Sequence, residues 1–401
     1  MQKKILFLGA APTQIPPLRY AREQGHYVIT CDYLPDNPGH KLADEWHNVS
    51  TTDKEAVLAL AQRLKIDAIV AYASDPAAPT AAYVAEKMGL PGNPYQSVLT
   101  LARKDLFRAF LKEHGFKVPR SQSFRDRDAA RAWLEEIGLP AFIKPVDSSG
   151  SKGVTKLSRL EEFNVAFDYA MSFSREKMVV VEQAIERVGY QIDSDIFFLK
   201  GEPAFWIWGD QHQDKYCHQF APIGISFPSV LDESIQAKAI DEVSSVIKKL
   251  NFCQGAFNVE FIVDSNDDVW IIEVGPRNGG NLIPEVIRCA TGIDLVKYTV
   301  DAALGLPCAG LDLKPAKGYW SSYLVHARES GFLKDISLTD RVKSKIVEMD
   351  IYTRPGDRVE KYMGSNHTLG TMILKFDSMD EMLDMMDNME RDIKVMVDED
   401  S

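Results

Sequence analysis

Residues 255–280 read GAFNVEFIVDSNDDVWIIEVGPRNGG, and this stretch predicts a β-hairpin that carries two glutamates. Two runs of strongly β-forming residues flank the turn-forming centre SNDD. If SNDD is the loop, Asp264 pairs with Val269. Counting outward in antiparallel register then places Glu260 directly opposite Glu273.

The alternation of a strand gives this hairpin one polar and one apolar face. Asn258 joins Glu260 on the polar face, and the residues expected to point into a core are Phe257, Val259, Phe261 and Val263. Like charges that face each other across a ladder are destabilising, so we expect a cation between the glutamates. Magnesium takes one or two carboxylates and fills its octahedron with water and phosphate oxygens. The hairpin therefore predicts a magnesium-nucleotide site, and a solvated surface pair is the alternative.

Arg277 and Asn278 follow within five residues of Glu273, in a run, GPRNGGN, that is too rich in glycine to be an ordinary strand. This composition indicates an active-site loop. A guanidinium there can stabilise a phosphoryl group during transfer, or it can form a salt bridge to one of the glutamates.

Residues 142–157, FIKPVDSSGSKGVTKL, place Lys144 on a strand before a loop of small residues. Such a loop can turn backbone N–H groups toward an anion. It is not a P-loop, because the β-forming residues Val154 and Thr155 follow it instead of a helix. We expect a hairpin tip that closes over phosphates, with a plain turn as the alternative.

Two further segments lie about forty residues to either side of Lys144. Lys104 precedes it, and VVVEQAIERVGYQID, residues 179–193, follows it. In that second segment a buried strand gives way to Glu182 and Gln183, whose backbone and side-chain groups can bond the amino edge of adenine. Each of these residues also has an ordinary surface explanation.

The start of the chain repeats a strand-helix-strand pattern through KILFLGA, HYVITCDY and DAIVAYA, which predicts a small parallel α/β unit. Gly9 and Asp32 stand where a dinucleotide site has its first glycine and its ribose-binding acid. The second and third glycines of that motif are missing, so NAD binding is disfavoured. The turn-rich GLPGNPYQS ends the unit near residue 95.

After this unit we expect a helix over 98–114, then strands interrupted by helices near 126–136 and 233–250. The last segment, from about 310, holds strands and a methionine-rich helix whose stripe is interpreted as core. The loop at 209–224, GDQHQDKYCHQFAPIG, is polar and is not expected to form a good strand.

Composition excludes several classes of function. The chain has 401 residues, 45% of them apolar, and a net charge of -12, which works against a nucleic-acid partner. Five cysteines lie far apart without a Cys-x-x-Cys pair, so no thiolate metal site or disulfide framework is indicated. The N-terminus is interpreted as a strand rather than a signal peptide, and no membrane helix is indicated. We expect a cytoplasmic protein.

These elements, in this order, resemble the ATP-grasp superfamily, which includes biotin carboxylase, carbamoyl-phosphate synthetase, purine-pathway ligases, D-alanine:D-alanine ligase and L-amino-acid ligases. The resemblance covers about residues 1–310. It implies an α/β fold with an N-terminal Rossmann-like pre-ATP-grasp domain (1–95), an ATP-grasp domain of two α+β subdomains (96–310) and a small α+β C-terminal domain (311–401). It also implies a homodimer.

The resemblance further implies that ATP and Mg²⁺, or Mn²⁺, bind at matching positions. Glu260 and Glu273 become the metal ligands. The nucleotide contacts become Lys104, Lys144, Ser148, Ser149, Gly150, Ser151, Gly153, Val154, Glu182, Gln183, Ala184, Ile185 and Gln191.

The sequence departs from the family pattern at three places. Gln191 stands where the family usually has a glutamate on the ribose. Gly275 stands where many members have a metal-binding asparagine, so the third ligand is missing or is supplied by Asn278. GGNL replaces the Q-V-E-H run of biotin carboxylases, and no biotin-attachment Met-Lys-Met follows, so biotin carboxylation is disfavoured.

The polar loop 209–224 falls where related enzymes place substrate-facing residues, which makes His212, Lys215 and His218 candidates. Simple packing is the alternative for each histidine. The resemblance implies an ATP-dependent carboxylate-amine (or carboxylate-thiol) ligase that forms an acyl phosphate and releases ADP and phosphate, with Arg277 and His218 as catalytic residues. The alternatives are an ATP-grasp carboxylase or phosphotransferase, a non-catalytic ATP-binding protein, and a dehydrogenase that uses the first domain.

Overall fold

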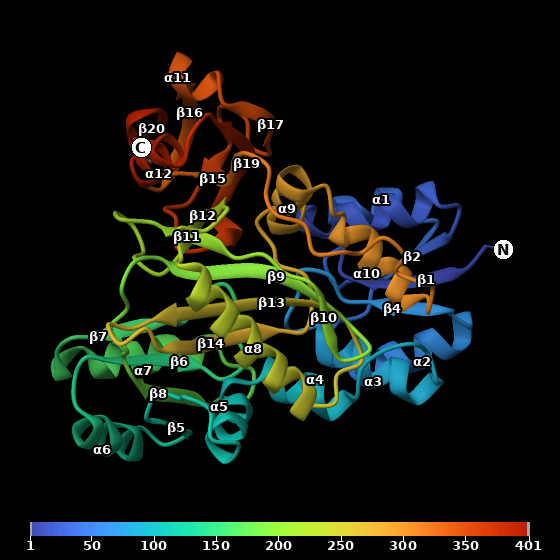
Figure 1. Cartoon of the computed structure of the whole chain (residues 1–401), viewed down its shortest axis with the longest axis horizontal. Helices are drawn as coiled ribbons and strands as arrows, with labels where there is room; N and C mark the ends of the chain where they lie inside the picture. The colour runs from blue at the N-terminus through green and yellow to red at the C-terminus, as the bar shows by residue number, and fades with distance from the viewer. Residues whose placement is uncertain (1, 399–401) are drawn as a thin grey trace.

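In the computed structural model, which describes residues 2–398, the strands form four sheets (Figure 1). The first is parallel, in the order β3-β2-β1-β4. Its strands are Lys4–Leu8 (β1), Tyr27–Cys31 (β2), Glu45–His47 (β3) and Ala68–Val70 (β4). The helices of this unit are Ile15–Glu23 (α1), Lys54–Leu64 (α2) and Ala78–Met88 (α3). The predicted parallel α/β unit is confirmed.

The single helix expected over 98–114 is wrong, because the chain forms two helices, Tyr95–Ala102 (α4) and Lys104–Glu113 (α5). Arg103 between them is extended, with φ -116° and ψ 118°. The backbone N–H of Lys104 donates to the Val146 carbonyl at 2.9 Å instead of to the preceding helix. The break therefore places Lys104 at the start of α5, beside the strand that precedes residues 148–153, called the Gly/Ser loop below.

The second sheet is antiparallel, in the order β5-β8-β6-β7. Its strands are Ser121–Phe124 (β5), Ala141–Pro145 (β6), Thr155–Leu157 (β7) and Val179–Gln183 (β8). Two helices share its core, Arg127–Ile137 (α6) and Phe163–Phe173 (α7). The first was expected and the second was not. In α7, the spacing of Phe163, Ala166, Phe167 and Ala170 gives one buried helical face.

The large central sheet has the order β14-β13-β9-β11-β12-β15-β19-β17, with β10 paired to β9. Its strands are Gln191–Leu199 (β9), Glu202–Phe205 (β10), Gly209–Gln213 (β11), Pro222–Phe227 (β12), Gln254–Val263 (β13), Val269–Gly275 (β14), Tyr319–His326 (β15), Ile346–Ile351 (β17) and Thr368–Phe376 (β19). Its helices are Glu233–Lys249 (α8), as expected, Ile283–Thr291 (α9) and Leu295–Ala303 (α10). The sheet continues from the β13-β14 hairpin into the last segment of the chain.

The polar segment that was not expected to be a strand forms β11, in the middle of this sheet. Asp210, Gln211 and His212 are buried, and each has a polar partner. Asp210 accepts from the Val230 N–H at 2.9 Å, and Gln211 donates to Asp193 at 3.1 Å. Satisfied hydrogen bonds remove most of the cost of burying polar groups.

The last segment adds a small sheet in the order β18-β16-β20, made of Gly331–Leu338 (β16), Arg358–Val359 (β18) and Ile393–Asp398 (β20). Its helices are Asp340–Lys343 (α11) and Met379–Asp387 (α12). Met382, Met385 and Met386 are buried in the core of this segment, which confirms the interpretation of the methionine stripe. Within residues 2–398, no helix combines the length and the apolar character that crossing a membrane requires.

Candidate active site

The β13-β14 hairpin brings Glu260 opposite Glu273, as predicted, but by a different route. At the turn Val263, not Asp264, pairs with Val269. A bulge in β14, where the unpaired Ile272 precedes Glu273, then restores the expected register. The four apolar residues of the opposite face are buried, as expected, and Asn258 lines the polar side.

Asp193 on β9 is a third carboxylate in the same row, and the sequence analysis missed it. It pairs with Glu260 across the other edge of β13, so the order across three strands is Asp193, Glu260, Glu273. Alternation along β9 places Gln191, Asp193 and Asp195 on one face. That alternation was a usable signal, but the sequence does not say that β9 is the neighbour of β13.

Nearby cations do not fully neutralise the negative charge of the three carboxylates in this row. Lys104 Nζ lies 2.9 Å from Glu273 Oε2. Within residues 2–398, by contrast, the one hydrogen bond that Glu260 Oε2 accepts is from the neutral side chain of Gln191, at 2.6 Å. Burial, followed by the charges of Asp193 and Glu273, raises the pKa of Glu260 well above its usual value. Burial also raises the pKa of Asp193 to about 6. These are oxygen ligands whose mutual repulsion a divalent cation would relieve.

Within residues 2–398, no three Asp, Glu, His or Cys side chains already converge as a metal cage. A magnesium ion at this row would therefore take further oxygens from phosphate and water, which is its usual coordination beside a nucleotide. The donor set fits that ion.

The row faces a cavity of about 440 Å³ enclosed by the parallel unit, the small antiparallel sheet, the central sheet and Ser365. It is lined by fourteen of the residues that the sequence singled out: Lys104, Lys144, Ser148, Ser149, Gly150, Ser151, Val154, Glu182, Gln183, Ile185, Gln191, Glu260, Glu273 and Arg277. Gly153, Ala184, Asn278 and His218 do not line it.

The Gly/Ser loop is folded toward this cavity by two contacts. Lys104 Nζ donates to the Ser148 carbonyl at 2.8 Å, and Ser151 Oγ donates to the Phe220 carbonyl at 2.7 Å. Gly150 has φ +64°, a conformation that glycine adopts without strain. Lys104 thus joins the loop to Glu273 through one ammonium group.

Lys144 and Glu182 form a buried ion pair, with Arg108 Nε 3.0 Å from the second carboxylate oxygen. Burial alone would raise the pKa of Glu182, but Arg108 and Lys144 outweigh it and lower the pKa to about 2. The carboxylate is therefore engaged by two cations and is not free to bond adenine. Arg108 was missed, because nothing in the sequence of α5 marks it as the partner of a strand 74 residues away.

Arg277 forms a two-pronged ion pair with Asp75, from the parallel unit, and not with either glutamate. This pair also accounts for Gly275. A Cβ atom at that position would lie 2.7 Å from Asp75 Oδ1 and 3.0 Å from Arg277 Cζ, so an asparagine side chain does not fit there. The departure from the family pattern is therefore coupled to an ion pair between two parts of the chain.

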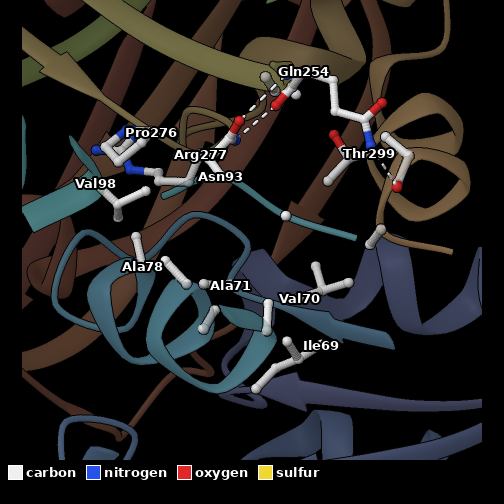
Figure 2. A pocket seen from close by; sticks show the side chains of 18 of the residues that line it. Ile69, Val70, Ala71, Ala78, Asn93, Val98, Gln254, Pro276, Arg277 and Thr299 are labelled. Atoms are coloured by element: carbon white, nitrogen blue, oxygen red, sulfur yellow. Dashed lines mark hydrogen bonds between the residues drawn. The ribbon is translucent and has the colours of Figure 1, made fainter. Parts of the chain in front are cut away.

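Arg277 also borders a smaller cavity, of about 120 Å³, whose lining includes Asn93, Gln254 and Thr299 (Figure 2). There Asn93 Nδ2 donates to the Gln254 carbonyl at 2.7 Å and ties the end of the parallel unit to β13. Arg277 thus lies at the junction between the parallel unit and the central sheet.

Asn278 is fully buried, and both polar atoms of its side chain are engaged. Its Nδ2 donates to Asp195 at 3.1 Å, and its Oδ1 accepts from Thr299 at 2.7 Å. The structure therefore does not bring it to the glutamates. Asp195 in turn accepts from the Gly279 N–H at 2.7 Å, and a Cβ at Gly279 would lie 2.8 Å from that carboxylate.

The three candidates of the polar loop also lie away from the cavity. His212 is buried between Asp387 and Ser226, at 2.9 and 2.7 Å. Lys215 donates to the Asp387 carbonyl. The backbone of His218 donates to Asp214 at 2.8 Å, and its ring packs near Phe220. Their contacts attach the loop to α12 and β12.

Two family models match the chain. One, described as carbamoyl-phosphate synthase L chain, ATP binding domain, matches residues 103–310. The other, described as L-amino acid ligase C-terminal domain 2, matches residues 323–398.

Among curated relatives, a formate-dependent phosphoribosylglycinamide formyltransferase of Burkholderia mallei is 31% identical over 290 residues, which is 68% of this chain and 69% of that protein. The uncharacterized protein y4rH of Sinorhizobium fredii is 27% identical over 77% of this chain. That match spans 64% of the length of y4rH, a little under two thirds.

Two solved structures share the fold across nearly the whole chain. An L-amino acid ligase from Bacillus licheniformis has a TM-score of 0.82 at 19% identity and covers 99% of each chain. The biotin carboxylase domain dimer of Hydrogenobacter thermophilus 2-oxoglutarate carboxylase, solved with MgADP, ADP and bicarbonate, has a TM-score of 0.75 at 18% identity and covers 99% of this chain and 91% of that one.

Proposed function

This chain belongs to the ATP-grasp superfamily, and we propose that it is an ATP-dependent carboxylate-amine (or carboxylate-thiol) ligase. It acts through an acyl phosphate and releases ADP and phosphate. The observation that carries the proposal is the row Asp193, Glu260, Glu273, which faces the same cavity as Lys104, Arg277 and the Gly/Ser loop. Such an arrangement suits a polyphosphate that arrives with a divalent cation.

In this proposal the cavity holds ATP between the parallel sheet, the sheet β5-β8-β6-β7 and the central sheet. Gln183, Ile185 and the backbone beside Glu182 line the adenine end, while Gln191 lies at the ribose. Lys104, Lys144 and the amides of residues 148–151 hold the phosphates. Mg²⁺, or Mn²⁺, bound at Glu260 and Glu273 would supply charge neutralisation for the transferred phosphoryl group.

The chain's own residues then position and stabilise the reaction. A substrate carboxylate oxygen attacks the γ-phosphorus, and the bond from that phosphorus to the β-γ bridging oxygen breaks to give ADP. An amine or thiol next attacks the acyl carbon, phosphate leaves, and the nucleophile loses its proton. Arg277, held in one orientation by Asp75, is placed to stabilise negative charge in both steps.

A trapping experiment tests this function. The protein is incubated with Mg-ATP, pools of amino acids and other carboxylates, and hydroxylamine. We expect substrate-stimulated ADP together with a hydroxamate. ADP with bicarbonate alone, or a phosphorylated product without hydroxamate, would instead identify a carboxylase or a phosphotransferase. Tight ATP binding without stimulated ADP release in any pool would identify a binding protein.

We further propose that the enzyme is a cytoplasmic homodimer that acts on small molecules. The biotin carboxylase domain of the Hydrogenobacter enzyme, which shares this fold, is a dimer, and this supports the proposed oligomeric state. Light scattering coupled to size-exclusion chromatography tests it, with a mass near twice 45.0 kDa expected and a mass near 45.0 kDa contradicting it.

A further inference from the structure

A second cavity, of about 310 Å³, adjoins the nucleotide cavity. The two share Thr13, Gly280, Asn281 and Ser365, so a ligand in one can contact a ligand in the other. The second cavity is walled by residues 11–16, the segment before and in α9, and strands of the last segment. None of the residues proposed to hold ATP phosphates or metal lines it.

Two residues that line this cavity carry a buried hydroxyl group with no hydrogen-bond partner within residues 2–398. These groups are the hydroxyl of Tyr72, a residue that is 3% exposed, and Oγ1 of Thr368. By contrast, the Tyr352 hydroxyl in the same wall is 3.0 Å from Thr371 Oγ1. An unpaired buried hydroxyl costs about 1–3 kcal/mol, which a ligand can recover.

The charge of the cavity selects the kind of ligand. Among the described residues, Glu285 is the only charged one that lines it, and no lysine, arginine or histidine does. The remaining lining residues are uncharged, and Pro12, Pro16 and Leu324 are among the apolar ones. A ligand carboxylate placed here would be repelled and would find no cation, whereas an ammonium group would find both a counter-ion and an oxygen acceptor.

The groups around Glu285 leave its carboxylate available. Arg288 on the same helix lies 3.8 Å from Glu348 of β17. The other ionisable groups that interact with Glu285 within residues 2–398 are Asp294, Tyr72, Tyr352 and Cys289. Burial raises the pKa of Glu285 to about 7. A bound cation favours the ionised form, so cation affinity rises as the pH increases through 7.

We propose that this cavity binds the primary ammonium group of a small, otherwise apolar substrate, with Glu285 as counter-ion and the Tyr72 oxygen as acceptor. The proposal rests on the proposed function for what that substrate does next. The ammonium group belongs either to the amine that is acylated or to an amino acid whose carboxylate points toward Arg277. Both sources share the chemistry that Glu285 and Tyr72 recognise.

Calorimetry with three isosteric probes tests the site. Propylammonium, propionate and 1-propanol are titrated into the full chain saturated with MgADP at pH 8. We expect propylammonium to bind, and propionate and propanol to bind at least 10-fold more weakly. Glu285→Gln should weaken propylammonium about 10-fold or more, because it removes a hydrogen bond to a charged group. Tyr72→Phe should weaken it about 3-fold to 10-fold.

The matched control is Glu202→Gln, which removes an exposed carboxylate outside the cavity and should leave propylammonium binding unchanged. Unchanged MgADP affinity in every variant shows that each is folded. Equal binding of propylammonium by wild type and Glu285→Gln would overturn the proposal, as would preferential binding of propionate.

Turnover distinguishes the two sources. ADP release stimulated by an apolar amino acid alone, with hydroxylamine present, assigns the ammonium group to the carboxylate substrate. ADP release that needs a separate carboxylate, with propylamine entering the product, assigns it to the acceptor. If propylammonium binds through Glu285 but no pool yields hydroxamate, the ligase proposal fails and the ammonium site stands. If wild type and Glu285→Gln form hydroxamate at the same rate, the ligase proposal stands and the ammonium site fails.

Discussion

Glu260 on β13 lies directly opposite Asp193 on β9, and within residues 2–398 neither carboxylate has an ion-pair partner. Their hydrogen bonds come from the neutral side chains of Gln191, Asn258 and Gln211. The pair therefore stores electrostatic repulsion in the folded protein. A folded protein retains such repulsion at a cost to stability, and function is the common reason.

Replacing Glu260 by glutamine should remove the repulsion and the activity together. We expect the free energy of unfolding to rise by about 1 kcal/mol, as for relief of a like-charge cross-strand pair. We expect ATP turnover to fall at least about 100-fold, a loss typical for removing one group that stabilises transferred charge. Urea unfolding and an ADP-release assay measure the two effects.

Glu202→Gln is the control for this substitution, because Glu202 is exposed and its one ion pair within residues 2–398 is with Lys248 at the surface. It should leave both quantities within experimental error. Full turnover by Glu260→Gln would remove Glu260 from the metal site.

Gly275→Asn should break the junction between the parallel unit and the central sheet. The new side chain would overlap the Asp75-Arg277 pair, so we expect unfolding to become easier by about 1–3 kcal/mol and turnover to be lost. Gly89→Asn is the control, since asparagine is tolerated at the left-handed end of α3. In an Asp75→Ala background the cost of Gly275→Asn should shrink, and strict additivity in this cycle would show that the two positions do not compete for space.

Lys104→Met should loosen the Gly/Ser loop even without nucleotide. Lys104 holds the Ser148 carbonyl and Glu273 at once, at 2.8 and 2.9 Å. Hydrogen exchange in residues 148–153 should therefore accelerate, and the KM for ATP should rise about 10-fold or more. Lys152→Met, which removes a charge from the loop itself but no ion pair found in residues 2–398, should leave the exchange rate nearly unchanged. Equal exchange in wild type and Lys104→Met would contradict the bridging role.

Asp214 gives a pH-dependent contribution to stability outside the nucleotide cavity. Burial would raise its pKa, but a hydrogen bond from His326 and the N–H groups of His218 and Cys217 outweigh burial and lower the pKa to about 2. The stabilisation is therefore present above the ordinary pKa of about 4 and is lost as the pH falls toward 2.

We expect Asp214→Asn to lower the free energy of unfolding by about 2 kcal/mol at pH 7, with the difference from wild type shrinking below pH 4. Urea titrations at pH 7, 4 and 3 measure this. Asp312→Asn, at an exposed position, should show no such trend. A difference that is independent of pH would mean that the carboxylate charge is not the cause.

Much of the candidate site's geometry could be predicted because its residues lie in short motifs with a clear period. The opposition of Glu260 and Glu273 follows from alternation around a turn, and the buried and polar faces of β13 follow from the same rule. The correct pairing nevertheless depended on a bulge that compensates for a longer turn. Hydrophobic alternation does not reveal such a bulge, because the bulge adds a single unpaired residue and the alternation resumes after it.

The parts of the site that could not be predicted from the sequence are contacts between distant segments. Asp75 reaches Arg277 from the turn between β4 and α3, and Arg108 reaches Glu182 from a helix. Asp193 joins the row only because β9 is the neighbour of β13. Nothing local marks these pairings. Asn278, expected as a metal ligand, illustrates the converse, because its side chain is engaged by Asp195 and Thr299 instead.

The strand β11 was missed for a different reason. Sequence patterns identify strands by apolar alternation, and the residues GDQHQ have none. The segment is stable as a strand because neighbouring elements satisfy its polar groups, with His212 contacting Asp387 of α12 and Gln211 contacting Asp193. These hydrogen bonds join segments that are distant in the sequence, so they exist only in the folded chain.

The most direct test of the ligase proposal follows the oxygen of the substrate. The first carboxylate found to stimulate ADP release is labelled with ¹⁸O in its carboxyl group and incubated with Mg-ATP and its nucleophile, and the phosphate released is examined by mass spectrometry. The account predicts one ¹⁸O atom transferred to each phosphate, because an acyl phosphate passes a carboxylate oxygen to phosphorus. Phosphate without label, formed at the same rate as the product, would contradict it.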